Sequence, residues 1–575
     1  MPAAGSEASG ADVPAAGSEA SGADLPTAGS EASGTSPVAG GNRIRAEVRR
    51  RRTFAIISHP DAGKSTMTEA LALHARMISE AGAIHGKAGR KSTVSDWMEM
   101  EKARGISVSS TALQFNYLPA DAPAGSEPDV INLVDTPGHA DFSEDTYRVL
   151  TAVDAAVMLI DAAKGLEPQT LKLFQVCRHR GIPVITVINK WDRPGRTPLE
   201  LIDEISERIG LIPTPLYFPV GIAGDFRGLL DRRTGQYIHF TRTAGGATIA
   251  PEEILDDAAA AQREGAAWTE ATEESELLTE MGQDHDEELF LGGQTSPMIF
   301  ASAMLNFGVR QLLETLAELA PAPAARTDID GTVRQPTDPF SAVVFKVQAG
   351  MDSSHRDRLA FMRIVSGEFE RGMVVTHAQT GKPFATKYAQ AVFGRDRSTV
   401  DTAYPGDVVG LVNATALAPG DTLFDGPKVQ FPPIPSFAPE HFSSLRVTTA
   451  DKYKQFRKGM DQLDSEGVVQ VLRNEVRGDA SPVLAAVGPM QFEVVTARMK
   501  AEFNVDTVIE PLGYSLARRT DAESADELNR QRGVEVFTRS SDGVLLALFS
   551  DKWRLQYIEK EHPELTLEPL VAAAD

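Results

Sequence analysis

The segment from Ser58 to Ser65, Ser-His-Pro-Asp-Ala-Gly-Lys-Ser, has the residue types and spacing of a phosphate-binding loop, although Ser58 stands where the general motif has glycine. It follows a β-rich apolar run, Thr53–Ile57, and opens a helical stretch, so its backbone N–H groups gather at a helix N-terminus, where phosphate oxygens are well bound. Lys64 is expected to reach the β and γ phosphates, and the hydroxyl of Ser65 to hold Mg²⁺. The loop residues expected at the nucleotide are Ser58, His59, Pro60, Asp61, Ala62, Gly63, Lys64, Ser65 and Thr66.

A second motif, Asp135-Thr-Pro-Gly-His139, follows the apolar run Val130–Val134. At the C-terminal end of a strand it would lie beside the phosphate loop, where Asp135 could orient Mg²⁺ through a water and the Gly138 amide could sense the γ-phosphate. His139 is the expected catalytic residue, with its imidazole pointed at the attacking water. The whole motif is expected to face the nucleotide: Asp135, Thr136, Pro137, Gly138 and His139.

A third motif, Asn189-Lys-Trp-Asp192, is the candidate for base recognition. A carboxylate such as that of Asp192 accepts two hydrogen bonds, from the guanine N1–H and 2-amino groups, which adenine does not offer. Lys190 is expected to stack its aliphatic stem over the base. Ser302-Ala303-Met304 resembles the last element of such sites, whose backbone touches the guanine carbonyl. The predicted ligand is therefore GTP or GDP, bound through Asn189, Lys190, Trp191, Asp192, Ser302 and Ala303.

These motifs need a scaffold that brings several strand ends together, and the intervening sequence predicts one. Apolar β-rich runs alternate with helical stretches, a pattern typical of a parallel, doubly wound sheet, which binds ligands at the carboxyl ends of its strands. The helix Gln169–Arg180 is followed by Gly181 and Pro183, which are stop signals. The predicted strands are Thr53–Ile57, Val130–Val134, Ala155–Ile160, Pro183–Ile188, Leu216–Val220 and Met298–Ser302.

Changes in composition divide the chain further. A Pro/Ala-rich stretch, Ala320–Ala325, marks the end of a GTP-binding domain at 43–325, and β-rich runs punctuated by Gly and Asp predict an antiparallel β-barrel domain at 335–430. Strands mixed with amphipathic helices predict one C-terminal α+β domain at 437–575. The expected fold class is multidomain, with an α/β P-loop GTPase domain first. The C-terminal elements are expected at Ser444–Thr448, Lys452–Ser465, Val483–Val487 and Met490–Glu502.

The N-terminus repeats a twelve-residue phrase of small and acidic residues across positions 3–37. Almost nothing in it can be buried, so residues 1–42 are expected to form a disordered tail, although a partner-binding role stays open. The basic patch Arg43–Arg52 that follows is either an RNA contact or, more commonly, the solvated entry to a domain.

Charge and hydropathy exclude several classes of protein. A net charge of −23 over 575 residues argues against a surface that adheres everywhere to nucleic acid, so any RNA contact must be local. The acidity is concentrated in 251–290, with fourteen carboxylates and one arginine, which indicates a solvated insertion at about 241–296. No signal peptide and no apolar run of about 20 residues is evident, so we expect a cytoplasmic protein without a membrane partner. The single cysteine, Cys177, is expected to be a buried thiol without chemistry.

Several phrases resemble the bacterial peptide chain release factor three family of translational GTPases: SHPDAGKST, SDWMEMEKARGISV, DTPGHADFSEDTYR and HRDRLAFMRIVSG. The similarity runs from about Arg49 to near residue 565. It implies that Arg104-Gly-Ile-Ser107 is the first switch segment and that the Ser107 hydroxyl completes the Mg²⁺ shell. It also implies that His139 is inert until a ribosome positions it.

The resemblance further implies a function and partners. A GTPase of this family binds the ribosome after peptide release and promotes departure of the codon-reading release factor, here expected to act as a monomer. The barrel would contact the small ribosomal subunit. Candidate RNA contacts are Arg356 with Arg358, and a predicted helix face that could equally be merely solvated, formed by Lys452, Lys454, Arg457 and Lys458.

Two alternatives stay open on the residues alone. An elongation-type or ribosome-protection GTPase shares the same motifs, but it needs further C-terminal domains, whereas the sequence after residue 437 suggests one unit. A membrane or signalling switch also fits the motifs, but it has no need of the barrel. The phrase SDWMEMEKARGISV favours the release factor type over elongation factor G.

Overall fold

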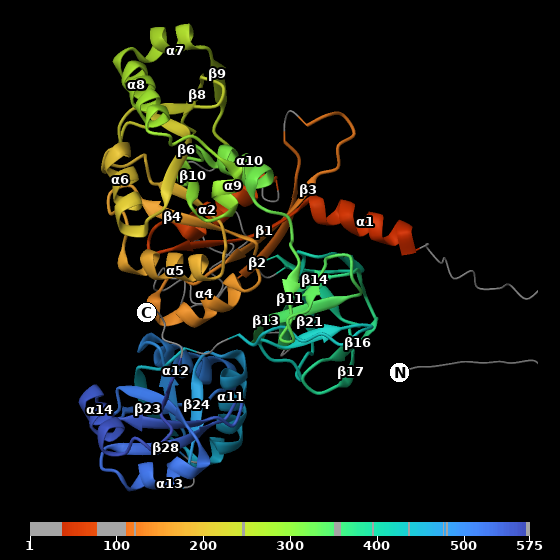
Figure 1. Ribbon diagram of the computed structural model, residues 1–575, viewed down its shortest axis with the longest axis vertical. Helices are drawn as coiled ribbons and strands as arrows, with labels where there is room; N and C mark the ends of the chain where they lie inside the picture. The colour runs from red at the N-terminus through yellow and green to blue at the C-terminus, as the bar shows by residue number, and fades with distance from the viewer. Residues whose placement is uncertain are drawn as a thin grey trace, which may run out of the picture.

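The computed structural model describes residues 37–76, 111–119, 122–243, 248–349, 358–393, 396–434, 437–474, 476–478 and 481–570. These residues form three bodies: a large α/β domain, a β domain beside it, and an α+β domain at the C-terminal end (Figure 1). The multidomain fold class expected from the sequence is therefore confirmed. The repetitive tail up to residue 36, Ser107 and Arg356 lie outside the described residues. None of the helices in the described part of the chain combines the length and apolar character needed to span a bilayer.

The first domain, here called the G domain, is built on one mixed sheet. Its strands are β1 Arg51–Ser58, β2 Thr111–Tyr117, β3 Asp129–Asp135, β4 Ala155–Asp161, β5 Val184–Asn189, β6 Ile212–Val220, β7 Gly228–Asp231, β8 Gln236–Phe240, β9 Glu252–Leu255 and β10 Thr295–Phe300. The order is β2-β3-β1-β4-β5-β10-β6-β7-β8-β9. The neighbouring strands β3, β1, β4, β5, β10 and β6 all run parallel, as expected. The sequence did not predict the antiparallel edge strand β2 or the antiparallel extension β7-β8-β9.

Helices cover the sheet, and some of them lie where the sequence predicted no regular structure. They are α1 Pro37–Arg49, α2 Lys64–His74, η1 Ala140–Phe142, α4 Ser143–Leu150, α5 Pro168–His179, α6 Pro198–Ile209, α7 Asp257–Glu264, α8 Ala266–Glu280, α9 Glu287–Leu291 and α10 Val309–Leu319. Helix α1 begins within the stretch expected to be a tail. The acidic insertion carries β9 and three helices, and it buries Trp268 and Phe290 against the sheet, while its last residues already belong to β10.

The basic patch at the end of α1 contacts its own protein. Arg43 pairs with Glu368 of the second domain, Arg51 pairs with Glu47, and the Arg52 Nε donates to the carbonyl of Ala317 at 3.1 Å. These partners favour the domain-entry interpretation of the patch over an RNA contact.

The second domain, here called the barrel, is antiparallel. A short pair, β11 Arg326–Thr327 and β12 Val333–Arg334, leads into it, and its strands are β13 Ser341–Ala349, β14 Arg358–Ser366, β15 Phe369–Glu370, β16 Val374–His377, β17 Lys382–Ala385, β18 Ala389–Phe393, β19 Asp396–Thr399, β20 Thr402–Ala403, β21 Val408–Val412 and β22 Thr422–Phe424. The main sheet has the order β17-β16-β22-β13-β14-β21-β18-β19 and surrounds one apolar core that includes Val344, Met362 and Leu411.

The C-terminal domain contains two units of the same topology, where the sequence suggested one. Its elements are β23 His441–Val447, η3 Ala450–Lys452, α11 Tyr453–Glu466, β24 Gln470–Arg473, β25 Val483–Ala486, α12 Met490–Phe503, β26 Thr507–Pro511, β27 Leu516–Thr520, α13 Ala522–Arg530, β28 Val534–Arg539, β29 Leu545–Phe549, α14 Lys552–Glu561 and β30 Glu568–Pro569. Each half runs β-α-β-β-α-β. The halves join through β24 and β28 into one sheet, β26-β23-β25-β24-β28-β29-β27-β30.

The G domain and the barrel are joined by buried charged groups. Arg363 of β14 is buried and donates through Nη1 to the carbonyl of Ala152 at 2.6 Å and through Nη2 to Asp154 Oδ2 at 2.5 Å. Arg326 donates to the carbonyl of Thr151 at 2.7 Å. Because both cations reach into the turn that precedes β4, they fix the barrel against this end of the sheet.

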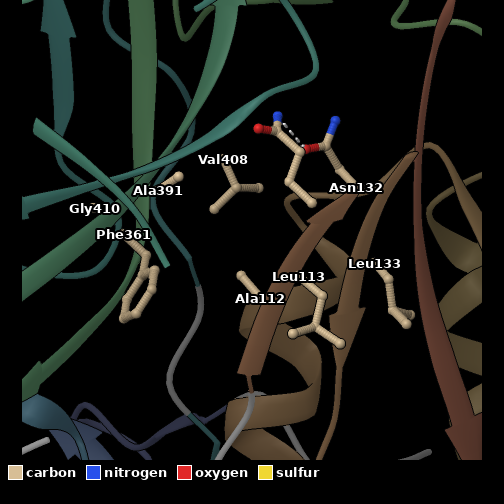
Figure 2. Close-up of a pocket in the computed structure, with 9 residues that line it drawn as sticks. Ala112, Leu113, Asn132, Leu133, Phe361, Ala391, Val408 and Gly410 are labelled. Carbon is tan, nitrogen blue, oxygen red and sulfur yellow. Dashed lines mark hydrogen bonds between the residues drawn. The ribbon is translucent and has the colours of Figure 1, made fainter. Parts of the chain in front are cut away.

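A turn of the barrel also contacts the edge of the G-domain sheet through Asp407. The Asp407 carboxylate accepts hydrogen bonds from Gln114 Nε2 at 2.9 Å and Asn132 Nδ2 at 3.3 Å, and it lies 2.9 Å from Arg51 Nε. Beneath this network is a small cavity between the two domains (Figure 2). It is lined by Ala112, Leu113, Gln114, Asn132 and Leu133 of the G domain and by Phe361, Ala391, Val408 and Gly410 of the barrel.

Candidate nucleotide site

The predicted motifs meet at one edge of the G-domain sheet. The strand order places β1 between β3 and β4, and β5 between β4 and β10, so the loops after β1, β3, β5 and β10 all leave from the carboxyl edge of the parallel strands. This edge is where an open α/β sheet binds its ligands.

The phosphate-loop motif forms a tight turn into α2. Gly63 is the N-cap of the helix and has φ 96°, a left-handed conformation that favours glycine. A Cβ added there would lie 2.5 Å from Asn189 Nδ2. Both the backbone conformation and the space therefore require glycine. The turn leaves Lys64 and Ser65 in the first turn of α2, where backbone N–H groups favour an anion.

Asn189 connects the phosphate loop to the loop after β10. Its Nδ2 donates to the carbonyl of Ala62 at 2.8 Å, and its Oδ1 accepts the N–H of Ala303 at 3.0 Å. The side chain is buried, so both ends of the amide are used within the protein. Asn189 thus shapes the site by holding two loops at a fixed separation.

Lys190 is held by a residue that lies outside the predicted motifs. Its Nζ donates to Asp161 Oδ2 at 2.9 Å and to the carbonyl of Asp61. Burial alone would raise the pKa of Asp161, but the hydrogen bonds from Lys190 and from the backbone N–H groups of Ala163 and Lys164 hold that pKa below its usual value. Asp161 is the last residue of β4, and a carboxylate at a strand end was the signal that could have revealed it.

Asp192 is oriented by the loop after β10. Its Oδ1 accepts a hydrogen bond from Ser302 Oγ at 2.5 Å, and Ser302 Oγ itself accepts the N–H of Leu305 at 3.2 Å. The serine hydroxyl is therefore fixed as a donor to the carboxylate. Ser302 contributes its side chain to this arrangement, in addition to the backbone contact that the sequence predicted.

Other motif residues are buried and support the loops. Trp191 is fully buried and packs edge-on against Phe300, with ring centroids 4.8 Å apart. Thr136 Oγ1 donates to the carbonyl of Ile56 at 2.6 Å. His59 is buried with Nε2 3.0 Å from a Glu167 carboxylate oxygen, and burial lowers its pKa despite this carboxylate. These three side chains point into the protein, so only their backbones can face a ligand.

The motif after β3 closes over the phosphate loop. A Cβ added to Gly138 would lie 3.0 Å from Lys64 Nζ and 3.7 Å from the Cα of Pro60. Glycine therefore lets the backbone approach the lysine that would bind phosphate. The buried carboxylate of Asp135 at the end of β3 and the hydroxyl of Ser65 on α2 are oxygen donors of the kind that Mg²⁺ prefers. The residues present fit a nucleotide with Mg²⁺.

His139 lies at the rim of this site. Its side chain is 31% exposed, and its Nδ1 lies 3.2 Å from Asp141 Oδ1. The backbone N–H of Asp141 also donates to Nδ1, at 3.3 Å. The imidazole is thus held from one side, which leaves Nε2 as the nitrogen that can act on a water.

The predicted RNA contacts divide between exposed and structural residues. Lys454, Arg457 and Lys458 are exposed on α11, and Lys452 at its start is partly exposed. Arg358 Nη2 donates to the carbonyl of Leu417 at 2.9 Å and so supports a loop of the barrel.

Comparisons with known proteins agree with this geometry. Family models match in chain order: the elongation factor Tu GTP binding domain at 49–322, elongation factor G domain 2 at 339–426, and the class II release factor RF3 C-terminal domain at 431–559. The chain is 46% identical over 525 residues to peptide chain release factor 3 of Gloeothece citriformis, covering 90% of this chain and 95% of the relative. It is 47% identical over 534 residues to peptide chain release factor 3 of Rippkaea orientalis, covering 91% and 96%.

A solved structure shares the fold. The crystal structure of a protein from Thermus thermophilus aligns with a TM-score of 0.63 at 21% identity, over 82% of this chain and 68% of that one. At this level of identity the likeness concerns the fold alone.

Proposed function

The chain belongs to the peptide chain release factor 3 family, and from that premise we propose that the site at the carboxyl edge of the G-domain sheet binds GTP and GDP with Mg²⁺ through the residues described above. Membership makes the protein a GTPase that acts in translation termination. The observation that carries the residue assignment is the joining of three separate loops by Asn189 and Ser302, because these bonds bring three of the motifs together at one place.

The base side of the site would select guanine. The carboxylate of Asp192 is fixed by Ser302 through Oδ1, and Oδ2, which lies 3.9 Å from Arg193 Nε, would accept the guanine N1–H and 2-amino groups. Lys190 is held by Asp161, and its aliphatic stem would stack over the base. Adenine would present an unpaired nitrogen acceptor to the carboxylate and would be rejected.

The other end of the site would bind the negatively charged phosphates of the nucleotide and Mg²⁺. Backbone N–H groups of the loop and the ammonium of Lys64 would hold the β and γ phosphates, and Ser65, Asp135 and Ser107 would hold Mg²⁺, directly or through water. When bound, Mg²⁺ neutralises the charge that develops on the phosphate oxygens. The Gly138 amide would register the γ-phosphate, and His139 would orient the water that attacks it.

The partner that fits is the ribosome bearing a codon-reading release factor, with this protein acting as a monomer in the cytoplasm. GTP binding and hydrolysis would drive recycling of that factor after peptide release. The exposed basic residues of α11, Lys454, Arg457 and Lys458, are candidate rRNA contacts on a chain that is otherwise acidic.

A termination assay tests this function. Ribosome complexes stalled after peptide release would carry a fluorescently labelled codon-reading release factor, and its dissociation would be followed with GTP alone, with the protein alone, and with both. We expect faster dissociation only with both. Unchanged dissociation, together with accelerated translocation in a parallel assay, would indicate an elongation-type GTPase instead.

A further inference from the structure

Asp141 links the GTPase site to the C-terminal domain. It lies in η1, two residues after His139, and its side chain is almost fully buried. One carboxylate oxygen, Oδ1, lies 3.2 Å from His139 Nδ1, and the other, Oδ2, accepts the N–H of Met490 at 2.6 Å. Met490 is the first residue of α12, in a different domain. One carboxylate therefore touches both the proposed hydrolytic histidine and the C-terminal domain.

The turn before α12 is shaped around this carboxylate. A Cβ added to Gly488 would lie 2.0 Å from the Asp141 Cγ and within 2.5 Å of both carboxylate oxygens. Gln491 Oε1 accepts the N–H groups of Val487 at 2.7 Å and Gly488 at 3.2 Å, which fixes the turn. Glycine is required here for space, because any side chain would displace Asp141.

Further contacts join the two domains near this carboxylate. Phe142, which follows Asp141, packs against Val494 of α12. Nearby, the Tyr147 ring packs edge-on against Phe437, with centroids 5.3 Å apart, and Arg148 Nη1 donates to the carbonyl of Glu466 at 3.3 Å. Helix α12 lies below α4 in Figure 1, and it contacts η1. In such a buried setting a carboxylate stays where its hydrogen bonds place it.

We propose that Asp141 is a positioning residue for His139, and that the turn Gly488–Met490 of the C-terminal domain completes the GTPase site by holding the Asp141 carboxylate. This inference rests on the proposed role of His139. The N-terminal end of α12 favours a negative charge, which strengthens the bond from Met490. The C-terminal domain thereby reaches the hydrolytic site without touching the nucleotide.

Asp141 contacts the imidazole only through Nδ1, by its backbone N–H at 3.3 Å and by its carboxylate at 3.2 Å. Contacts to this one nitrogen restrict the orientation of the ring, which is what a group that positions water needs.

The test is a double-mutant cycle read by ribosome-stimulated, single-turnover GTP hydrolysis with the full chain. Asp141→Ala and Gly488→Ala are each expected to lower the maximal rate about 10- to 100-fold, the usual cost of misplacing a reacting group by about 1 Å. GTP affinity and the ribosome concentration for half-maximal rate should stay unchanged. The double variant should be no slower than Asp141→Ala, because Gly488→Ala acts only through Asp141.

Controls separate this role from a loss of structure and from failure of the proposed function. Gly513→Ala is a matched change in the same domain, at an exposed glycine with no atom within 4 Å of the added Cβ, and it should leave the rate unaltered. His139→Ala should abolish stimulation, and Asp141→Ala in that background should add nothing. Retained stimulation in His139→Ala would refute the role of His139. Two outcomes would overturn the positioning role alone. In the first, His139→Ala loses all stimulation but Asp141→Ala and Gly488→Ala hydrolyse GTP at the wild-type rate or faster. In the second, the losses of the two single variants add up in the double variant.

Discussion

Substituting Asp192 by asparagine should move base specificity from guanine to xanthine, because the surrounding loop fixes which way the new amide points. Ser302 Oγ accepts from the Leu305 N–H and is thereby committed to donate to Oδ1 of residue 192. An asparagine keeps that bond only with its carbonyl oxygen toward Ser302. Its NH₂ group then replaces Oδ2 and faces the base as a donor.

The size of the expected loss in GTP affinity follows from the hydrogen bonds that the substitution removes. Guanine presents two donors to the wild-type carboxylate, and a hydrogen bond to a charged group contributes about 1.5–3 kcal/mol. Losing two such bonds costs about 3–6 kcal/mol, or about 10²- to 10⁴-fold in the Kd for GTP. Xanthine carries a carbonyl in place of the 2-amino group, so the asparagine amide can donate to it and recover part of this energy.

Equilibrium titration with fluorescent GTP and XTP analogues measures both effects. Asp203→Asn is a matched control, since it makes the same change at an exposed position of α6. It should bind both nucleotides as the wild type does. An Asp192→Asn variant with unchanged GTP affinity, or one that loses GTP without gaining XTP, would refute the assignment of base recognition to this carboxylate.

Three further variants test the hydrolytic, interdomain and pH-dependent parts of the structure. His139→Ala should bind GTP about as tightly as the wild type but lose ribosome-stimulated phosphate release, and surviving stimulation would assign the water to another group. Arg363→Met removes the cation that is hydrogen-bonded to the largely buried Asp154 and should lower the free energy of unfolding in urea by about 3–5 kcal/mol, so a loss below about 1 kcal/mol would contradict a tight buried pair. Burial and the nearby Arg310 lower the pKa of His74 to about 4, so the folded protein keeps this ring neutral while the unfolded chain protonates below about pH 6.5. The free energy of unfolding should therefore fall as the pH falls from about 6.5 to about 4, and His74→Leu should remove up to about 3 kcal/mol of that fall. Identical pH profiles of the variant and the wild type in urea unfolding would contradict this role of His74.

The parts of the site that depend on local sequence were predictable. The parallel strands are buried on both faces and so appear as continuous apolar runs, and each motif follows such a run directly. Gly63 and Gly138 belong to motifs whose spacing already implies close backbone approach. The residues proposed to recognise the base follow β5 and β10, which are neighbours in the sheet.

Contacts between distant positions could not be read from the sequence. Asp161 holds Lys190 from 29 positions away, and Asp141 meets Met490 across 349 positions. The edge strand β2 pairs with β3 in the antiparallel direction, and the residues of β2 alone do not encode that direction. The second β-α-β-β-α-β unit was missed for a similar reason, since the duplication is visible in strand order and not in residue pattern.

The two interfaces of the G domain differ in a way that bears on how a nucleotide signal could travel. The barrel is joined through buried charged groups at Arg363 and Asp407. Separating it would take Arg363 from Asp154, and Arg51 and Gln114 from Asp407, so the barrel should move together with the sheet. The C-terminal domain instead meets the loop that carries His139, through Asp141 and the residues of α4. Because Asp141 is shared, the C-terminal domain cannot shift at this contact without changing what orients His139. If His139 has the role proposed for it, movement of the C-terminal domain would therefore be registered at the site of hydrolysis.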